Sequence, residues 1–278
     1  MSLRQSIITV LTLGGLAVVR LPAAADKAAF GLGNPTPEAE LRDLSSDRPD
    51  ATEAPFTVDA GHVQLEMDLL NHTASDSGGG RTSEWGVVPF NLRLGVRDNF
   101  ELGLFVAPYI RRTTHAAGEA SGTRAGFGDL TLRAKVNFQG NDGGGTALGL
   151  ITDLKLPTAA QGLGNGALEG SVLLPVSVEL GGGWDLGAMT GVDLVRNEAG
   201  HRRCGWINSV TTGHDITRSL AGYVEVATET GADAPVTTLD AGLMLKLNAD
   251  TQLDAGVQLG LSRSADDALV FTGLTRRF

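Results

Sequence analysis

Charged side chains recur at every second position within otherwise apolar segments of the sequence. Side chains at every second position share one face of an extended strand. Carboxylates and basic groups on such faces could bind one another across neighbouring strands, or could bind ions and polar solutes in a water-filled space. The residues of this ionic face that we expect to carry function are Glu66, Asp68, Arg93, Glu101, Arg133, Lys135, Asp153 and Lys155.

Acids outnumber bases on the ionic face. Its further members are Glu179, Asp185, Asp193, Glu225, Asp240, Lys246 and Asp254, which brings the face to ten acids and five bases. If this face encloses an aqueous lumen, the excess of negative charge favours cations and neutral solutes over anions. The net charge of the chain is −10, which argues against nucleic acid as a partner, because phosphate binding requires many basic side chains.

Catalytic and metal-binding chemistry has little support in the sequence. Hydrolysis by a serine nucleophile needs a Ser and a His within hydrogen-bonding reach and a third group that orients the His. None of the five histidines has a serine at a convincing cross-strand position. No two His or Cys recur at metal-ligand spacing, and Cys204 is the single cysteine. We therefore predict no catalytic residue, no metal and no cofactor.

The elements that position the ionic face are strands. From Gly61 to the C-terminus, twelve segments of alternating apolar and polar residues are separated by turn residues. If 97–99 is a three-residue turn, Arg93 lies diagonal to Glu101 on the neighbouring strand. The connections after even-numbered segments are short, and most of those after odd-numbered segments are longer, such as 72–81, 111–126, 158–170 and 196–205. Transmembrane barrels combine an even number of strands with short periplasmic turns and longer external loops.

The composition of the apolar face separates a membrane barrel from a soluble β-sandwich, which would alternate in the same way. That face uses Leu, Val, Ala and Gly, and aromatic residues are only 5% of the chain, too few for a typical sandwich core. No run of about 20 apolar residues follows the N-terminal segment, so a helical membrane protein is excluded. We predict an all-β fold, a transmembrane antiparallel up-and-down β-barrel of about 12 strands, with lipid outside and water or ion pairs inside.

The first 60 residues differ from the rest of the chain. Residues 1–25 have the basic, apolar and small-residue regions of a secretory signal peptide. Residues 26–60 contain four prolines and no sustained period, which is typical of an irregular segment. The predicted barrel then occupies residues 61–278.

The predicted last strand ends on an aromatic residue. Phe278, Leu274 and Val270 share one face of this strand, which needs a partner on both edges, and a closed barrel supplies both. The ending resembles the terminal signature of bacterial outer-membrane barrels, whose final Phe is recognised by the barrel-assembly machinery. The resemblance implies that Phe278 is an assembly signal and that this machinery is a partner.

Several short motifs point to a family. They are Asp47-Arg48-Pro49-Asp50-Ala51-Thr52-Glu53, Gly61-His62-Val63-Gln64-Leu65-Glu66, Gly126-Phe127-Gly128-Asp129-Leu130 with Lys135 beyond, and Lys155-Leu156-Pro157-Thr158. Together they resemble the outer-membrane transporter family named for the meta-cleavage pathway of phenol degradation, although Ala159 stands where that family usually has Gly. The resemblance implies an outer-membrane barrel that passes small, often aromatic or hydrophobic, molecules.

The resemblance also changes the interpretation of residues 26–60. We expect this segment to form a periplasmic strap or plug, with Asp47, Arg48, Pro49, Asp50 and Glu53 ordered at the mouth of the barrel. Arg48 would bind lumen carboxylates such as Glu66 or Asp68, and Asp50 would bind a lumen base.

The predicted function is an outer-membrane channel or transporter of a Gram-negative bacterium, in which small molecules pass through a narrow or partly plugged barrel. The alternatives are a structural barrel that transports nothing and an outer-membrane lipid hydrolase. The expected partners are outer-membrane lipid, the assembly machinery and a small-molecule solute, whereas the pattern sets neither the solute nor the oligomeric state. Basic residues in the longer connections could contact anionic headgroups or form a solvated cluster; they are Arg111, Arg112, Arg202 and Arg203.

Overall fold

The structure is a computed structural model, and it describes residues 27–278 except 78–79, 117–119, 198 and 232–233. The predicted signal peptide, residues 1–25, lies outside the described residues. The described chain contains two short 3-10 helices, η1 (Lys27–Ala29) and η2 (Glu38–Glu40), and fifteen strands. None of its helices has the length and apolar character needed to span a membrane.

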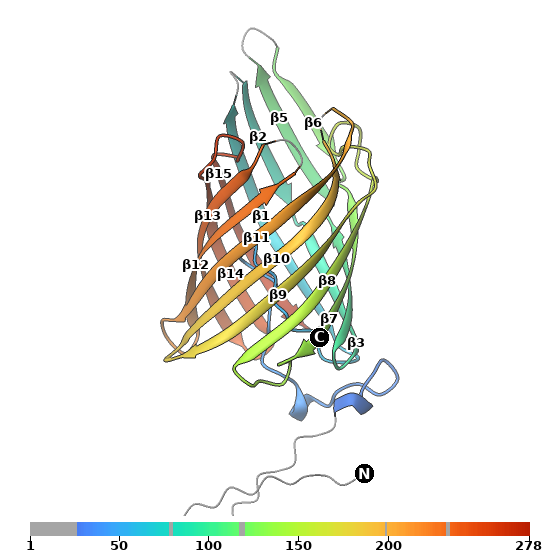
Figure 1. The fold of residues 1–278 in the computed structure, drawn as a ribbon, viewed down its shortest axis with the longest axis vertical. Coiled ribbons are helices and arrows are strands. Elements are labelled where there is room, and N and C mark those ends of the chain that lie inside the picture. The colour runs from blue at the N-terminus through green and yellow to red at the C-terminus, as the bar shows by residue number, and fades with distance from the viewer. Residues whose placement is uncertain (1–26, 78–79, 117–119, 198, 232–233) are drawn as a thin grey trace, which may run out of the picture.

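The strands form one antiparallel sheet that closes on itself (Figure 1). Neighbours in the sheet follow the order β15-β14-β13-β12-β11-β10-β9-β8-β7-β4-β3-β1-β2-β5-β6, and β1 also pairs with β15. The strands are β1 (Val63–Ser77), β2 (Gly80–Val87), β3 (Phe90–Arg97), β4 (Phe100–Val106), β5 (Tyr109–Ala116), β6 (Gly122–Gly126), β7 (Leu130–Gln139), β8 (Thr146–Leu156), β9 (Glu169–Gly181), β10 (Trp184–Arg196), β11 (Arg202–Asp215), β12 (Leu220–Thr230), β13 (Val236–Asn248), β14 (Thr251–Gly260) and β15 (Ala268–Arg277).

The barrel wall has twelve strands, because three of them are interrupted. β2 and β3 are the two parts of one wall strand, broken at Val88-Pro89; β4 and β5 are broken at Ala107-Pro108, and β6 and β7 at 127–129. Proline has no N–H to donate, so Pro89 and Pro108 interrupt the hydrogen-bonded ladder at the first two breaks. The predicted twelve-stranded antiparallel barrel is confirmed, and the interruptions were not predicted.

The two ends of the sheet meet at the last residue of the chain. β1 pairs with β15 from Gln64 to Ala74. Below this ladder, the Phe278 N–H donates to the Val63 carbonyl at 2.8 Å, and the Val63 N–H donates to the Phe278 carbonyl at 3.3 Å. Phe278 therefore belongs to the closing seam, and its proposed recognition by the assembly machinery stays a prediction.

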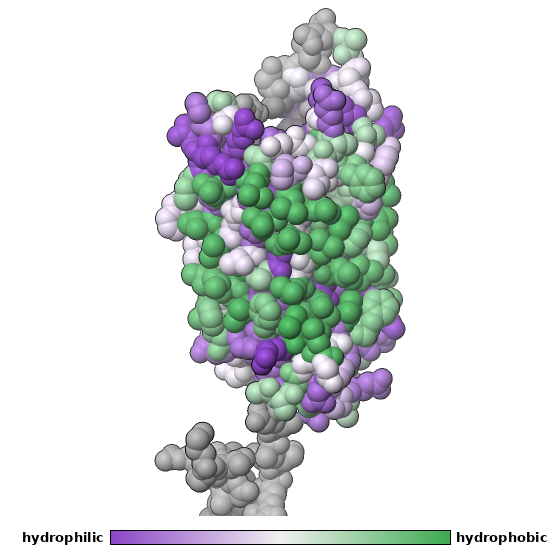
Figure 2. Space-filling view, turned by 90° about the vertical axis from the view of Figure 1, so that its right-hand side faces the viewer, coloured by the Kyte–Doolittle hydropathy of each residue, from purple (hydrophilic) through white to green (hydrophobic). Residues whose placement is uncertain are grey.

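The inner face of the wall carries the buried charged residues and one apolar cluster of Ile151, Leu173 and Met189, and the outer face is apolar. On β3 and β7, the buried Arg93 and Lys135 face the lumen, whereas Leu92 and Leu132 are exposed on the outer surface. Five of the ten largest fully buried side chains of the described chain are charged, which is the reverse of a soluble protein core. Figure 2 shows the complementary outer surface, a broad hydrophobic band with hydrophilic residues at both ends. This distribution is that of a barrel with lipid around it.

Two of the predicted long connections are mostly strand, and a third is shorter than predicted. β1 and β2 occupy nearly all of 72–81, β5 and β6 occupy most of 111–126, and β11 already begins at Arg202, so that only 197–201 connect it to β10. The first two predictions were wrong and the third was too wide, because antiparallel pairing continues above the apolar band, where the alternation of hydrophobicity fades. Within 158–170, in contrast, residues 158–168 form a true loop. We call the end of the barrel where β15 finishes the lower end, as in Figure 1, and the opposite end the upper end.

Candidate functional site

The segment before β1 runs into the lumen from the lower end (Figure 1). We call residues 27–60, the described part of the predicted strap, the strap. Its inner part is buried, since Asp47, Thr52 and Val58 are each less than 9% exposed. The strap is followed by Gly61, whose φ of 80° suits glycine. A Cβ there would lie 2.6 Å from the Pro35 side chain, so the turn into β1 requires a glycine.

Asp47 is the centre of an ion-pair cluster on the β3–β7 side of the lumen. Its carboxylate binds Lys135, lies 3.4 Å from Arg93 Nη1 and lies 3.7 Å from Arg133 Nη1. Burial alone raises the pKa of the Asp47 carboxyl, but the three cations more than offset this and lower it to about 2. Arg93 also binds Glu66 at 2.6 Å and Glu101 at 2.9 Å. The Asp47 carboxylate of the strap thus supplies negative charge to three cations of the wall.

The wall also holds the strap backbone. Three successive strap carbonyls, at 54, 55 and 56, accept hydrogen bonds from Lys135 Nζ at 2.9 Å, Asn137 Nδ2 at 2.9 Å and Arg93 Nη2 at 3.0 Å. The Val58 N–H donates to Glu101 Oε2 at 2.7 Å. An irregular segment can be buried only if its backbone groups find such partners, so the inner face and the strap form one hydrogen-bonded unit.

Two arginines link the strap to the wall in opposite directions. From the strap, Arg48 reaches β1 and β14, where it binds Asp68 and, at 2.6 Å, Asp254. From the wall, Arg133 binds Glu53 of the strap at 2.6 Å and Asp153 through two hydrogen bonds. Arg48 was predicted to bind a lumen carboxylate such as Glu66 or Asp68, and it binds Asp68. Glu66 instead binds Arg93 and accepts a hydrogen bond from the Asp47 N–H.

On the opposite side of the lumen the strap meets acids. Glu225 on β12 accepts hydrogen bonds from the backbone N–H groups of Ala51 and Thr52, each at 2.7 Å. The Thr52 hydroxyl lies against both Glu225 and Ser209 Oγ. The strap therefore bridges a basic side of the lumen, on β3 and β7, and an acidic side, on β12 to β14.

Asp50 lies on this acidic side and has no basic partner within the described residues. The expectation that it binds a lumen base is wrong, because the charged group that acts most strongly on it is Glu225. Burial, and then the Glu225 charge, raise the pKa of the Asp50 carboxyl to about 8. A docked strap consequently holds Asp50 protonated at neutral pH.

We predict that the strap is held less firmly at alkaline pH. The pKa of Asp50 is about 8 when docked and near its usual 3.8 when free, so the released strap loses the proton first as pH rises. Docking is therefore strongest at low pH and weakens as pH rises through this window. Single-channel conductance of the wild type should rise from about pH 5 to about pH 9, and Asp50→Asn should remove a large part of that rise. Glu53, whose pKa burial raises to about 7, contributes to the remainder.

Asp43→Asn provides the control for this titration, because Asp43 is an exposed acid of the same strap that forms no ion pair in the described structure. A conductance profile of Asp50→Asn that superimposes on that of the wild type would assign the pH dependence to another carboxyl.

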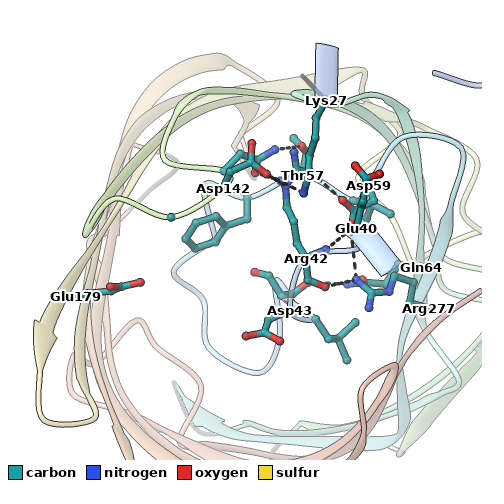
Figure 3. A pocket seen from close by; sticks show the side chains of 16 residues that line it. Lys27, Glu40, Arg42, Asp43, Thr57, Asp59, Gln64, Asp142, Glu179 and Arg277 are labelled. Atoms are coloured by element: carbon teal, nitrogen blue, oxygen red, sulfur yellow. Dashed lines mark hydrogen bonds and ion pairs between the residues drawn. The ribbon is translucent and has the colours of Figure 1, made fainter. Parts of the chain in front are cut away.

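A cavity of about 730 Å³ opens beneath the strap at the lower end (Figure 3). One side of it is a charged cluster, in which Arg42 lies 3.3 Å from Asp59 and 2.9 Å from Asp142. Arg277 on β15 binds the same Asp59 at 3.4 Å. Glu179 lies across the cavity from this cluster (Figure 3). The lower mouth is thus open beside the strap and lined by both charges.

A second cavity, of about 380 Å³, lies where the three wall strands break. Strap residues from Asp47 to Asp50 line its inner side, and Pro89, Ala107 and Asp129 line the wall side. Few ladder bonds cross this region; the Gly128 N–H donates to the Ala107 carbonyl at 2.9 Å. The cavity therefore extends from the strap to the weakest part of the wall.

A loop covers the wall above this cavity. β6 pairs only with β5, so its other edge has no strand partner in the described sheet. Residues 157–168 lie along it, where the Ala160 N–H donates to the Phe127 carbonyl and the Ala159 N–H donates to Asp129 Oδ1, each at 2.8 Å. Asp129 thus fixes the loop that replaces a missing wall strand.

All eight predicted residues of the ionic face point into the lumen and form ion pairs. The register of Gly95 with Glu101 and the diagonal pair Arg93–Glu101, at 2.9 Å, are confirmed. Arg42, Asp59 and Arg277 also line the lower mouth and were not predicted from the sequence. Arg277 could have been found, since it shares the inward parity of Thr275, but no pattern marks the strap residues.

The serine–histidine geometry corrects one expectation. His72 Nε2 lies 2.9 Å from Ser83 Oγ, and His115 Nδ1 also contacts Ser121, although no such pair was expected. Neither histidine has a carboxylate partner in the described structure. The described residues also contain no group of His, Cys, Asp and Glu arranged to bind a metal.

Comparisons with known proteins agree with this architecture. The COG4313 outer membrane channel from Pseudomonas putida F1 is similar, with a TM-score of 0.60 and 15% identity, covering 84% of this chain and 100% of that chain. The β domain of the Bordetella autotransporter Brka gives 0.52 and 14%, covering 78% and 99%. The NanC porin gives 0.51 and 6%, covering 76% and 98%. No curated protein sequence matches the chain.

These likenesses show the fold of outer-membrane barrels. The sequence itself matches, over residues 46–278, the model of the family described as "Putative MetA-pathway of phenol degradation". The match begins within the strap, just before Asp47, and runs through the whole barrel, so the chain belongs to this family.

Proposed function

We propose that the protein is an outer-membrane channel for small molecules, including aromatic or hydrophobic ones, whose lumen is closed by the strap. The twelve-stranded wall, its apolar outer band and the family support this placement. The lower end, with its short turns, faces the periplasm. One observation carries the proposal: the strap fills the lumen between the basic and acidic sides and leaves a cavity on either side of it.

The cavity at the strand breaks offers an entrance for apolar solutes. It joins the strap to a part of the wall with few ladder bonds, at the edge of β6 that only a loop covers. A hydrophobic solute dissolved in the lipid would enter there without crossing the charged lumen. Movement of the strap would then connect this entrance with the cavity at the lower end.

A structural barrel without transport is less consistent with the charges. Such a barrel gains stability if each inner charge is compensated. Asp50, Glu225 and Asp240 instead form an acidic group with no basic partner in the described structure. An uncompensated acidic surface fits a lumen that passes cations or neutral molecules.

Asp129→Ala tests the side entrance. Removal of this carboxylate releases the loop at Ala159 and removes the ion pair with Lys155 of β8, whose Nζ lies 3.5 Å from Asp129. We expect severalfold faster uptake of an uncharged aromatic fluorophore such as N-phenylnaphthylamine into proteoliposomes, with ion conductance nearly unchanged, because the strap is untouched.

Asp76→Ala is the matched control for this experiment, because Asp76 is an exposed acid of β1 that forms no described ion pair. Equal uptake by the Asp129→Ala variant and the wild type would place the entrance elsewhere. A gain in ion conductance as large as the gain in uptake would mean that the strap had also been displaced.

A further inference from the structure

The outer wall has a groove that the transport proposal does not use. It has a volume of about 440 Å³ and lies across β8, β9, β10 and β11. Gly170 forms its floor, because the outward position between Leu154 and Leu194 carries no side chain there. Leu168 and Val172 complete its apolar walls. These apolar walls suit a hydrocarbon chain rather than a polar solute.

Two arginines stand at the upper end of the groove. Arg196 and Arg202 are directly opposite one another in the β10–β11 ladder. Like charges at such positions repel and destabilise the pair of strands. Arg202 binds the Leu168 carbonyl at the rim of the groove, and Arg196 Nε donates to the Gly200 carbonyl at 3.1 Å. Within the described residues neither guanidinium forms an ion pair.

The alternation of β11 places these charges on the lipid side. Arg202, Cys204 and Trp206 share the exposed outer face, and Cys204 and Arg202 both line the groove. Gly205 belongs to the inner face, since Asp193 lies over it, and Arg203 shares that parity. Trp206 is 59% exposed and lies where aromatic residues mark the membrane interface. The arginines above it are therefore at the depth of lipid headgroups.

We propose that this groove binds a phosphorylated acyl lipid of the outer leaflet. One acyl chain lies over Gly170 between the leucines, and the phosphate lies between Arg196 and Arg202. The anion offsets the repulsion of the paired arginines, and guanidinium groups bind phosphate with two hydrogen bonds each in a fixed geometry. The inference rests on the proposed outer-membrane placement but requires no transport.

The single cysteine of the chain provides the probe. Cys204 is an exposed free thiol in the groove, so a bound lipid shields it. We would measure alkylation of Cys204 by an apolar maleimide, with the protein in phosphatidylcholine nanodiscs that contain increasing lipid A. Protection should appear at low lipid A content. Each of Arg196→Gln and Arg202→Gln should raise the lipid A fraction for half-protection about fivefold, the contribution of one cation near an anionic leaflet.

Arg203→Gln is the matched control, since it removes the same charge from the next residue of β11 on the inner face. A second control carries Leu259→Cys in a Cys204→Ser background, which places the thiol on the exposed outer face of β14, away from the groove. Inorganic phosphate in the buffer separates a free anion from a lipid headgroup. The shift of heated and unheated samples on a gel verifies that each variant is folded.

The outcomes are decisive in both directions. Protection of Cys204 by lipid A but not by phosphate, lost in the two groove variants and kept in Arg203→Gln, supports the site. Equal protection of a thiol at position 259 would show general shielding by the lipid and overturn it, as would unprotected Cys204 at every lipid A content. If Arg202→Gln fails to fold, Arg196→Gln carries the test by itself. Because no step of this experiment measures transport, a negative result for lipid binding would not contradict the channel proposal.

Discussion

Deletion of residues 40–56 is expected to raise single-channel conductance in a planar bilayer severalfold. This stretch contains the parts of the strap that bind both sides of the lumen, through Asp47 on one side and Ala51 and Thr52 on the other. Its removal replaces a packed segment with water. The acidic side of the lumen then faces the pore, so the reversal potential under a salt gradient should indicate cation selectivity.

The wall should survive this deletion, because it has ion pairs of its own. Arg93 keeps Glu66 and Glu101, and Arg133 keeps Asp153. A deletion of residues 27–33, which lie below the barrel in Figure 1, is the control and should leave the conductance near that of the wild type. Unchanged conductance after loss of 40–56 would mean that the strap does not block the lumen, and the search for the barrier would move to the loop at 157–168.

Asp47→Asn is expected to cost about 3–5 kcal/mol of unfolding free energy, the usual loss when one partner of a buried ion pair is removed. The amide keeps the shape of the side chain but leaves Lys135, Arg93 and Arg133 with less negative charge around them. The wild-type carboxylate has its pKa lowered to about 2, so its contribution is present above its usual pKa and is lost only as pH falls toward that value. Urea titration in detergent micelles measures the change.

A double-mutant cycle isolates the pair. Lys135→Met in the Asp47→Asn background should recover part of the loss, with a coupling of about 0.5–3 kcal/mol. Glu179→Gln is the control, because Glu179 is an exposed inner-face acid without an ion pair in the described structure, and a change within about 0.5 kcal/mol is expected. Additive losses from the two single variants would show that Asp47 acts through other contacts, such as the hydrogen bonds that its backbone N–H donates to Glu66.

The strap has a consequence for how the lumen can open. Its contacts divide into a basic side, where Asp47 is paired, and an acidic side, where Asp50 must hold a proton. The second side is the weaker one, since its charges repel once Asp50 ionises. We therefore expect release to begin at Asp50 and to proceed toward Asp47, so that Asp50→Asn and Asp47→Asn change the conductance in opposite directions.

The alternation of apolar and polar residues along the chain was by itself enough to predict the barrel. A strand that faces lipid on one side and charge on the other must alternate with a period of two, and twelve such segments could be counted. The same parity placed Arg93, Glu101 and Arg133 on the inner face, and a short turn fixed the Arg93–Glu101 pair. These features depend on neighbours along the chain or across one hairpin, and for that reason the sequence contains them.

Contacts between distant segments were decided only by the tertiary structure. Asp50 meets Glu225 rather than a base because closure of the barrel brings β12 across from β3 and β7. Arg277 binds Asp59 through the seam between the last strand and the strap. The three strand breaks border one cavity only because β2 to β7 lie side by side in the closed sheet, which brings the breaks together. The sequence determines which residues face inward, and closure of the sheet determines which of them meet.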